Sequence, residues 1–257
     1  MLFQNHFRVL AAALLLTAVG CGGGPETAEP EDPAVAEVYF KVDPATAAGV
    51  SGKVDFEGQA PKAVRINMSA EPDCKKLHGA AVHAEQVVVN ENGTLQNVFV
   101  WVKAGLEDKK FEVTKNGSLN QKGCIYRPHV VAMQAGGTMS VSNSDPLTHN
   151  VHPLPKVNRE WNKSQTPSAP DINRKFARQE IMVPVKCNIH PWMRAYISVV
   201  SHPFFAVTGK DGSFEIPGLP PGTYTLEAIH EKYGEQEMSV TLADSESKEV
   251  DFTFSAG

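Results

Sequence analysis

The 257-residue chain lacks long hydrophobic runs, an excess of basic charge and a dense set of cysteines. The apolar run at residues 9–19 is too short to cross a membrane as a helix, which takes about 20 residues. The 24 Lys and Arg are outnumbered by 29 Asp and Glu, which gives a formal charge of −5. Nucleic-acid-binding proteins need a basic footprint, so we expect no nucleic-acid partner. The acidic balance is compatible with a basic docking partner.

Two further absences narrow the chemistry and the fold. No Cys-x-x-Cys-His motif occurs, so covalent haem attachment is not expected. No stretch after the first 20 residues has a convincing helical period, whereas several short runs alternate apolar and polar residues as half-buried strands do. Residues 86–90 and 95–102 flank Asn92-Gly93, a strong hairpin signal. The polar segment 158–179 is expected to be a long loop or a short helix. The sequence therefore predicts an all-β protein.

Residues 1–20 have the features of a secretory leader, with Arg8 before an apolar run that ends near Cys21. The segment Ala-Val-Gly-Cys at 18–21 resembles a bacterial lipoprotein signal, in which the Cys becomes the lipidated first residue. The resemblance implies export to the bacterial cell envelope, on the periplasmic or outer-membrane side, and membrane attachment through a lipid on Cys21. The alternative is plain secretory cleavage with an incidental Cys. Residues 21–46 are expected to be a flexible tether, because 22–36 are rich in Gly, Pro, Glu and Ala.

The C-terminal residues 203–257 contain several short alternating strands separated by turns, which is typical of a β-sandwich. The runs Asp-Gly-Ser-Phe-Glu-Ile at 211–216 and Leu-Pro-Pro-Gly-Thr-Tyr-Thr-Leu at 219–226 resemble the carboxypeptidase regulatory-like, or transthyretin-like, domain. That family opens with a strand similar to residues 50–54. We therefore predict that residues 48–58, within a first segment 47–70, pair with the C-terminal strands of a smaller antiparallel sandwich. The central residues 71–202 would then be an inserted domain.

The segment 187–193 places a thiolate, an imidazole and a thioether within seven residues, as Cys187, His190 and Met193. A second imidazole, His149, lies upstream. Two His and one Cys with a weak axial Met form the ligand set of a blue-copper electron-transfer site. Zinc also binds Cys and His, but a thioether is a poor zinc ligand, so the Met favours copper.

Residues from about 124 to 201 resemble a cupredoxin of the amicyanin and plastocyanin type, on the Cys-x-x-His-x-x-Met loop and on His-Asn-Val-His at 149–152. The resemblance implies a Greek-key sandwich over 71–202 that holds one type 1 copper ion. It implies His149, Cys187 and His190 as equatorial ligands and Met193 as the axial ligand. In that family the downstream His has a ring edge at the surface, so His190, with Trp192 beside it, would be the electron port.

Three neighbouring features are predicted around these ligands. Asn150 is expected to tie the two ligand loops together by hydrogen bonds, as the resemblance implies. His152 is expected on the same face as His149, as a spare ligand or a partly buried neighbour of the site. Cys74 and Cys124, in an exported and oxidising setting, are expected to form a disulfide. The alternatives are two free thiols, or a second metal site that uses Cys74 and the nearby His78.

The function expected from these features is single-electron transfer between redox proteins, such as a dehydrogenase or a cytochrome, with no reaction catalysed by the chain itself. The resemblance to amicyanin points toward amine or methanol oxidation as the setting. Copper oxidases and nitrite reductases are disfavoured, because the chain has no second His-x-His cluster. The alternatives are a carbohydrate- or protein-binding module with a structural or lost copper site, and a copper store or sensor.

Overall fold

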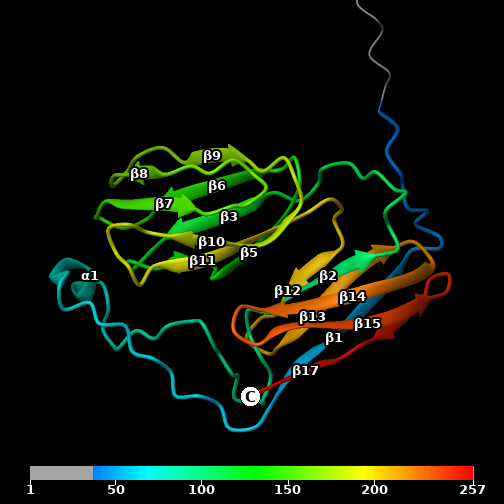
Figure 1. Cartoon of the computed structure of the whole chain (residues 1–257), viewed down its shortest axis with the longest axis horizontal. Helices are drawn as coiled ribbons and strands as arrows, with labels where there is room; N and C mark the ends of the chain where they lie inside the picture. The colour runs from blue at the N-terminus through cyan, green and yellow to red at the C-terminus, as the bar shows by residue number, and fades with distance from the viewer. Residues whose placement is uncertain (1–36, 257) are drawn as a thin grey trace, which may run out of the picture. The chain divides into compact units, whose positions relative to one another are not determined.

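The computed structural model describes residues 37–256, in which nearly all regular structure is β-strand. The strands form four sheets, arranged as two sandwiches (Figure 1). This confirms the predicted all-β class. Within the described residues α1 (Pro72–Lys76) is the single α-helix. No helix of the described part is long and apolar enough to cross a membrane. The predicted leader and Cys21 lie outside the described residues.

The first sandwich carries the predicted ligands and consists of sheets in the orders β5-β11-β10-β7-β8 and β4-β3-β6-β9. Its strands are β3 (Gly117–Gln121), β4 (Tyr126–Arg127), β5 (Val130–Gln134), β6 (Thr138–Asn143), β7 (His149–Pro153), β8 (Lys163–Gln165), β9 (Ile172–Lys175), β10 (Glu180–Lys186) and β11 (Arg194–Val200). The polar segment predicted as a loop or short helix contains the short strands β8 and β9. A core of interlocking apolar side chains lies between the sheets and includes Cys187 and Met193.

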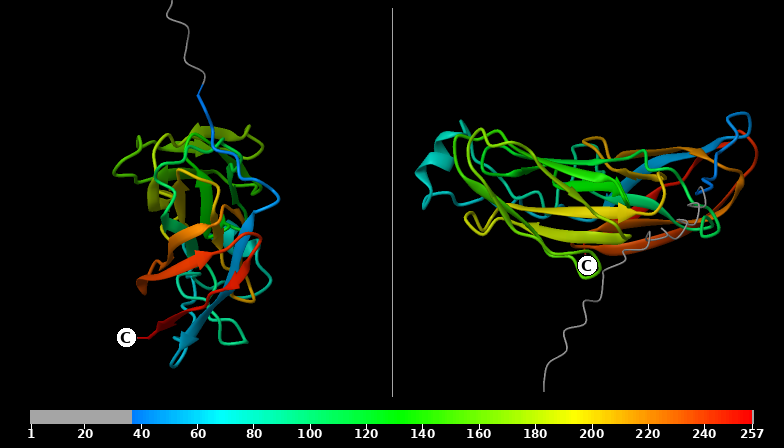
Figure 2. Two further views of the ribbon diagram at one scale, coloured as in Figure 1. Left: turned by 90° about the vertical axis from the view of Figure 1, so that its right-hand side faces the viewer. Right: turned by 90° about the horizontal axis from the view of Figure 1, so that it is seen from above.

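The second sandwich consists of sheets in the orders β13-β1-β16, with β17 also paired to β1, and β12-β2-β14-β15. Its strands are β1 (Ala48–Glu57), β2 (Phe99–Ala104), β12 (Phe205–Val207), β13 (Ser213–Leu219), β14 (Gly222–His230), β15 (Gly234–Leu242), β16 (Ser247–Glu249) and β17 (Phe252–Ser255). Both Figure 1 and Figure 2 place α1 at the end of the first sandwich that is distant from β14 and β15.

Strand β1 joins the C-terminal strands, although about 150 residues separate it from them in the sequence. It pairs antiparallel with β13, where Val50 lies opposite Ile216, and parallel with β16 and β17. Its alternate residues Val50 and Val54 are buried in the core of the second sandwich. The two parallel pairings make this sheet mixed, because a strand that arrives from far upstream is not bound to the antiparallel geometry of a hairpin.

Strand β2 differs from the predicted division of the chain. Residues 71–202 were expected to be one copper domain, yet β2 pairs with β12 and β14 of the second sandwich. The physical reason is that β2 is buried on both faces. Val98, which precedes β2, and every second residue after it face the core of the second sandwich. Phe99 and Trp101 point the other way and pack against Val130 and Val200 of the first sandwich. A continuous apolar run does not reveal which sheet contains it.

The end of the predicted tether is part of the folded structure. Residues 38–46 were expected to be flexible, but Val42 packs against the core of the second sandwich. The backbone N–H of Phe40 donates to the carbonyl of Lys110 at 2.6 Å, and the Phe40 ring lies 5.7 Å from that of Phe111. The apolar side chains of this segment therefore hold it against the folded part of the chain, although small and acidic residues surround them in the sequence.

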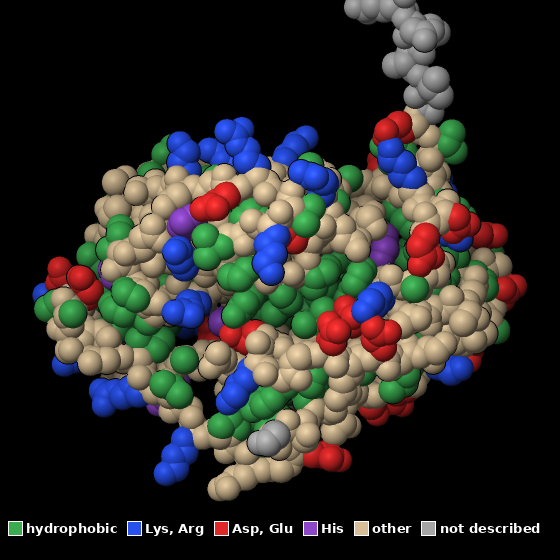
Figure 3. Space-filling model, viewed as in Figure 1, with side chains coloured by type: hydrophobic (Ala, Val, Ile, Leu, Met, Phe, Trp, Pro, Cys, Tyr) green, Lys and Arg blue, Asp and Glu red, His purple; other side chains and the backbone are tan. Residues whose placement is uncertain are grey.

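Charge is divided unequally along the chain. Residues 112–202 carry eleven Lys and Arg and five Asp and Glu, a formal charge of +6, whereas residues 203–257 carry three and ten, a formal charge of −7. Figure 3 shows Lys and Arg side chains gathered over the first sandwich and a cluster of Asp and Glu near β14 and β15. The overall charge of −5 conceals this division.

Two buried histidines make stability depend on pH. Burial lowers the pKa of His202 and of His230 to about 4, while an unfolded His titrates near 6.5. The unfolded chain therefore takes up protons first, so the free energy of unfolding is expected to fall as the pH drops from 6.5 to 4. The loss is at most about 3 kcal/mol for each His, at 1.36 kcal/mol per pKa unit.

Urea unfolding of the metal-free protein at pH 7 and pH 5 measures this loss. His230→Gln should reduce the difference between the two pH values, because its buried side chain is replaced by one that does not titrate. The control His83→Gln changes an exposed His and should leave the difference unchanged. An equal difference in both variants would contradict the assignment.

Candidate metal centre

The downstream ligand loop lies between β10 and β11, which hold its two ends together. Lys186 and Arg194 are opposite each other in the antiparallel register, so residues 187–193 form a closed turn. Within this turn the Cys187 N–H donates to the Met193 carbonyl at 3.2 Å, and the Met193 N–H donates to the His190 carbonyl at 2.9 Å. The sandwich therefore fixes the backbone that carries Cys187, His190 and Met193.

The upstream predicted ligand, His149, is the first residue of β7 and follows a turn at residues 143–148. The Asn143 side chain stabilises this turn, since its amide donates to the Leu147 carbonyl at 2.8 Å and its oxygen accepts the Asp145 N–H at 3.0 Å. The side chain thereby replaces backbone partners that an irregular segment lacks.

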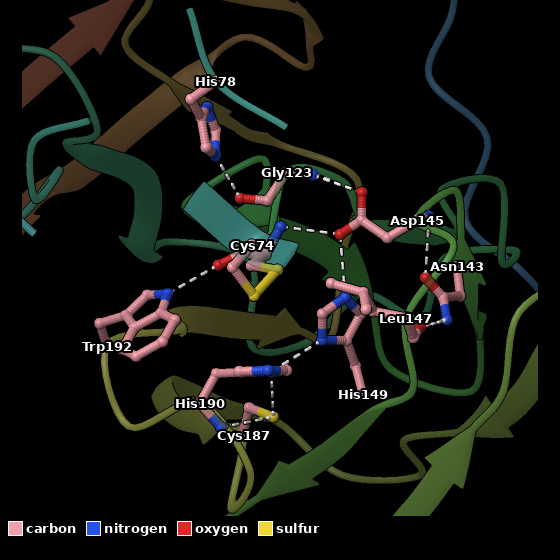
Figure 4. The surroundings of a disulfide bond; sticks show 11 residues. Cys74, His78, Gly123, Asn143, Asp145, Leu147, His149, Cys187, His190 and Trp192 are labelled. Carbon is pink, nitrogen blue, oxygen red and sulfur yellow. Dashed lines mark hydrogen bonds and ion pairs between the residues drawn. A yellow bond between two sulfur atoms is a disulfide. The ribbon is translucent and has the colours of Figure 1, made fainter. Parts of the chain in front are cut away.

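Three predicted ligands meet in the interior of the first sandwich. His149 and His190 direct their Nδ1 atoms toward each other at 2.9 Å, and Cys187 Sγ lies 3.8 Å from His190 Nδ1 (Figure 4). The donor atoms of all three residues lie within 4.8 Å of one another. Their exposed fractions are 0%, 2% and 3% for His149, Cys187 and His190, so the group is almost completely removed from water.

These donors fit one metal ion. Metal–nitrogen bonds of about 2.0 Å and metal–sulfur bonds of about 2.3 Å allow a single ion to bridge the 2.9 Å between the two imidazole nitrogens and the 3.8 Å between His190 Nδ1 and Cys187 Sγ. Two imidazoles and one thiolate form a set that suits copper. Met193 is fully buried beside them, and the contacts that tie it to the loop are those of its backbone.

Asn150 connects the two ligand loops, as was expected. Its side-chain oxygen accepts the Asn188 N–H at 2.7 Å and lies 3.3 Å from Cys187 Sγ, while its amide donates to Asn162 at 2.7 Å. The His190 N–H also points at Cys187 Sγ, at 3.4 Å. Hydrogen bonds from several directions restrict the position of the sulfur and thereby the geometry of any ion that it binds.

Asp145 is a residue of the site that the sequence analysis missed. Its Oδ2 lies 2.8 Å from His149 Nε2, so the carboxylate accepts the proton on the ring nitrogen that faces away from the other ligands. The successive N–H groups of Gly123 and Cys124 donate to the same carboxylate at 2.6 and 2.7 Å. The single signal available in the sequence was an Asp four residues before the ligand His.

The backbone that holds Asp145 has an unusual conformation. Gly123 and Cys124 both have positive φ, at 71° and 51°. Two successive N–H groups in such a turn form a concave site for an anion. A Cβ at Gly123 would lie 2.7 Å from the His78 ring, so this position requires glycine. The conformation aims two donors at the carboxylate, which in turn orients His149.

His152 does not join the site, and the expectation that it shares the face of His149 is wrong. It follows His149 by three positions, and residues an odd number apart in a strand point to opposite faces. Its Nε2 instead lies 2.6 Å from a carboxylate oxygen of Glu160, and its Nδ1 lies 3.3 Å from the Asn188 side-chain oxygen. It is a partly buried neighbour of the ligand loop, which was the second of the two expected alternatives.

Cys74 and Cys124 form a disulfide beside the candidate metal centre. Both sulfurs lie within 4.8 Å of a ring nitrogen of His190. The indole N–H of Trp192 donates to the Cys124 carbonyl at 2.9 Å, and its ring lies 5.3 Å from that of His190. His78 contacts the Gly123 carbonyl at 2.7 Å. The disulfide, α1 and Trp192 therefore cover His190, which has no exposed ring edge of the kind expected for an electron port.

The protonation of the site follows from its burial. Burial and then the neighbouring His149 lower the pKa of His190, so its imidazole is neutral at physiological pH and has a lone pair for a metal. Burial and then the charge of Cys187 raise the pKa of Tyr126, whose hydroxyl donates to the Asn150 carbonyl at 2.5 Å. Tyr126 remains a neutral donor that supports Asn150.

Asp145→Asn is expected to lower copper affinity by about 10–100-fold, the usual effect of removing a partner that orients a ligand His. The amide keeps the shape of the side chain, but it does not accept all three N–H groups as a carboxylate does. Competition with a chelator of known copper affinity measures the loss. Asp171→Asn, at an exposed position of the same sandwich, is the control. Equal affinities for the two variants would show that Asp145 does not orient His149.

The C-terminal part of the chain resembles a known family. Residues 190–255 match the carboxypeptidase regulatory-like domain. This region covers β11 to β17 and thus most strands of the second sandwich, as predicted from the runs at 211–216 and 219–226. No curated protein matches the chain in sequence.

Solved copper proteins show weak structural similarity to the chain. A copper-containing nitrite reductase from Thermus scotoductus SA-01 has a TM-score of 0.31 and 18% identity, over 39% of this chain and 25% of the reductase. A purple cupredoxin from Nitrosopumilus maritimus has a TM-score of 0.28 and 16% identity, over 33% and 99%. A methionine-to-glutamine mutant of amicyanin, in its Cu(I) form, has a TM-score of 0.28 and 19% identity, over 32% and 79%. Scores this low assign neither a fold nor a function to the chain.

Proposed function

We propose that the chain binds one copper ion at His149, Cys187 and His190, with Met193 as a weak fourth ligand, and transfers single electrons between redox proteins. The observation that supports this most strongly is the convergence of two imidazole nitrogens and one thiol sulfur at a buried point, on loops fixed by paired strands. A bound copper ion supplies one-electron exchange between Cu(I) and Cu(II).

The surrounding residues suit such an exchange because they resist rearrangement. Asn150 restrains the loop backbone next to Cys187 by accepting the Asn188 N–H, Asp145 restrains His149, and the disulfide restrains the segment beside His190. A site whose ligands move little between oxidation states has a low reorganisation energy, which favours fast electron transfer. Its burial keeps water from becoming an additional ligand. A store that releases copper readily would gain nothing from this rigidity.

The experiment that tests the proposal is copper loading followed by repeated chemical oxidation and reduction. A carrier should bind one copper per chain, lose its colour on reduction and recover it fully on oxidation. Release of the copper to a chelator on each reduction would indicate a store instead. Binding of zinc in preference to copper, with no redox change, would contradict the proposal.

We further propose that the protein is exported, anchored through a lipid on Cys21 and active in the bacterial cell envelope, where it carries electrons without a substrate of its own. The leader-like residues 1–20 and the disulfide, which persists in oxidising compartments, support this location. Cys21→Ser should move the protein from the detergent phase to the aqueous phase on phase separation. An unchanged partition would contradict lipid attachment at Cys21.

Met193→Leu is expected to retain copper and to raise its reduction potential. The replacement puts an apolar side chain of similar size beside the ion, which disfavours the more highly charged Cu(II) and thereby favours the reduced ion. Protein-film voltammetry measures the change, and Met139→Leu, at a buried position in β6 away from the loop, is the control. Complete loss of copper from Met193→Leu alone would show that Met193 is more than a weak axial ligand.

A further inference from the structure

We propose that electrons leave and enter the copper site through a groove beside Cys187, and that the groove binds the acidic surface of a redox protein. This inference rests on the proposed electron-transfer function and adds the docking face and the charge of the partner. The face differs from the His190 edge that the sequence analysis expected.

The groove lies on the outer side of β10 and β11 and has a volume of about 450 Å³. Cys187 itself is among its lining residues, although only 2% of its surface is exposed. Apolar walls flank it, formed by Leu154, Pro184 and Pro191. A partner seated here would lie against the residue that carries the thiolate ligand.

Two cations stand at the two ends of the ligand loop. Lys186 and Arg194 both line the groove, both are exposed and occupy opposite positions in the β10–β11 register. Like charges directly opposite each other in a sheet destabilise the pairing. Among the described residues no salt bridge compensates either cation. An acidic partner would relieve this repulsion.

The route through His190 is covered by other parts of the chain. His190 is about as buried as Cys187, but it is not among the residues that line the groove, and the disulfide, α1 and the Trp192 ring lie against it. The disulfide links α1 to Cys124 covalently, so this cover is cross-linked to the first sandwich. The Cys187 side has a groove, whereas the His190 side has a cross-linked cover.

The charge distribution of the whole molecule favours the same partner. Residues 112–202 carry a formal charge of +6 and residues 203–257 carry −7. Such a distribution attracts an acidic protein toward the first sandwich and repels it from the second, which raises the rate of productive encounters. The acidic balance of the whole chain suggested a basic partner. Because the basic residues gather on the part of the chain that holds the metal site, the partner expected there is acidic.

The test uses the full copper-loaded chain in the Cu(I) state and two oxidants of opposite charge. Hexacyanoferrate(III) is an anion and tris(phenanthroline)cobalt(III) is a cation, and each takes one electron, which converts Cu(I) to Cu(II). Stopped-flow absorbance gives the two rate constants as a function of ionic strength. The variant Lys186→Gln/Arg194→Gln removes the groove charges. The matched control Lys75→Gln/Lys76→Gln removes two exposed charges from α1, on the His190 side.

The groove variant should slow oxidation by hexacyanoferrate(III) about tenfold at low salt, speed oxidation by the cobalt complex, and lose most of the dependence on ionic strength. The control should change either rate by less than about twofold. Poly-L-glutamate, a carboxylate polymer without a redox centre, should slow the hexacyanoferrate(III) reaction of the unchanged chain but not of the groove variant.

Equal effects of the two variants, or a larger effect of the α1 variant, would overturn the inference while leaving electron transfer intact. A chain that binds no copper or does not cycle would instead refute the proposed function. Sedimentation at low salt tests a second copy as the occupant. If the unchanged chain forms a dimer and the groove variant does not, the groove binds the acidic strands of another copy. That result would overturn the proposed partner.

Discussion

Cys187→Ser is expected to abolish the intense visible absorption of the Cu(II) protein and to leave the β-structure in place. The absorption of a blue-copper site comes from the bond between thiolate and copper, and a serine hydroxyl does not form that bond. The serine hydroxyl can donate to the Asn150 side-chain oxygen and accept from the His190 N–H, as the thiol does, so the variant should remain folded. Optical and far-ultraviolet circular dichroism spectra measure the two parts of this result.

Ile189→Ser is the matched control for this variant. It changes a residue of the same loop whose side chain is 44% exposed, so both the colour and the fold should be retained. A visible band of normal intensity in Cys187→Ser would show that another group binds the copper. Loss of the band in Ile189→Ser as well would show that the colour depends on the whole loop, and X-ray absorption of the unchanged protein then identifies the copper-bound atom. Absence of sulfur from that copper shell would contradict the assignment of Cys187.

Cys74→Ser with Cys124→Ser is expected to lower the free energy of unfolding by about 4 kcal/mol. The bond closes a loop with a sequence separation of 50 residues, and the entropy of the unfolded chain rises by about this amount when a loop of that length is released. Urea unfolding of the metal-free protein measures the loss. Addition of a dithiol to the unchanged protein should give the same reduced stability.

The same double variant should also weaken copper binding. The Cys124 N–H donates to Asp145, which orients His149, and the disulfide covers His190, so release of the bond loosens the support of both ligands. Ser69→Ala, on the same side of the fold, is a control whose stability should be unchanged, because its side chain is exposed. Equal stability of the double variant and the unchanged protein under oxidising conditions would contradict a disulfide at this position.

The meeting of His149, Cys187 and His190 could be predicted from the sequence, because three of the four predicted ligands lie in one short loop. Cys187, His190 and Met193 are separated by two residues each, and a loop between two β-branched strands brings such residues to one end of a sandwich. The alternating pattern predicted a strand at β1, and the resemblance to the carboxypeptidase regulatory-like domain predicted that it joins the C-terminal strands; it pairs with β13, β16 and β17.

Other features depend on contacts that no local pattern reveals. The run that contains β2 has apolar residues on both faces, and only the tertiary structure shows that Phe99 and Trp101 join the two sandwiches. Asp145 looks like an ordinary turn residue until the backbone of Gly123 and Cys124 is placed against it. The cover over His190 depends on a disulfide from α1, in a region where the resemblance to cupredoxins is poor.

The central claim is that His149, Cys187 and His190 hold one copper ion through a thiolate bond. The most direct test is an optical and paramagnetic spectrum of the chain from residue 38 onward, the compact unit, loaded with Cu(II). An intense red absorption together with a narrow copper hyperfine splitting is the expected result, with one copper per chain. No such band, with copper bound weakly or not at all, would contradict the claim.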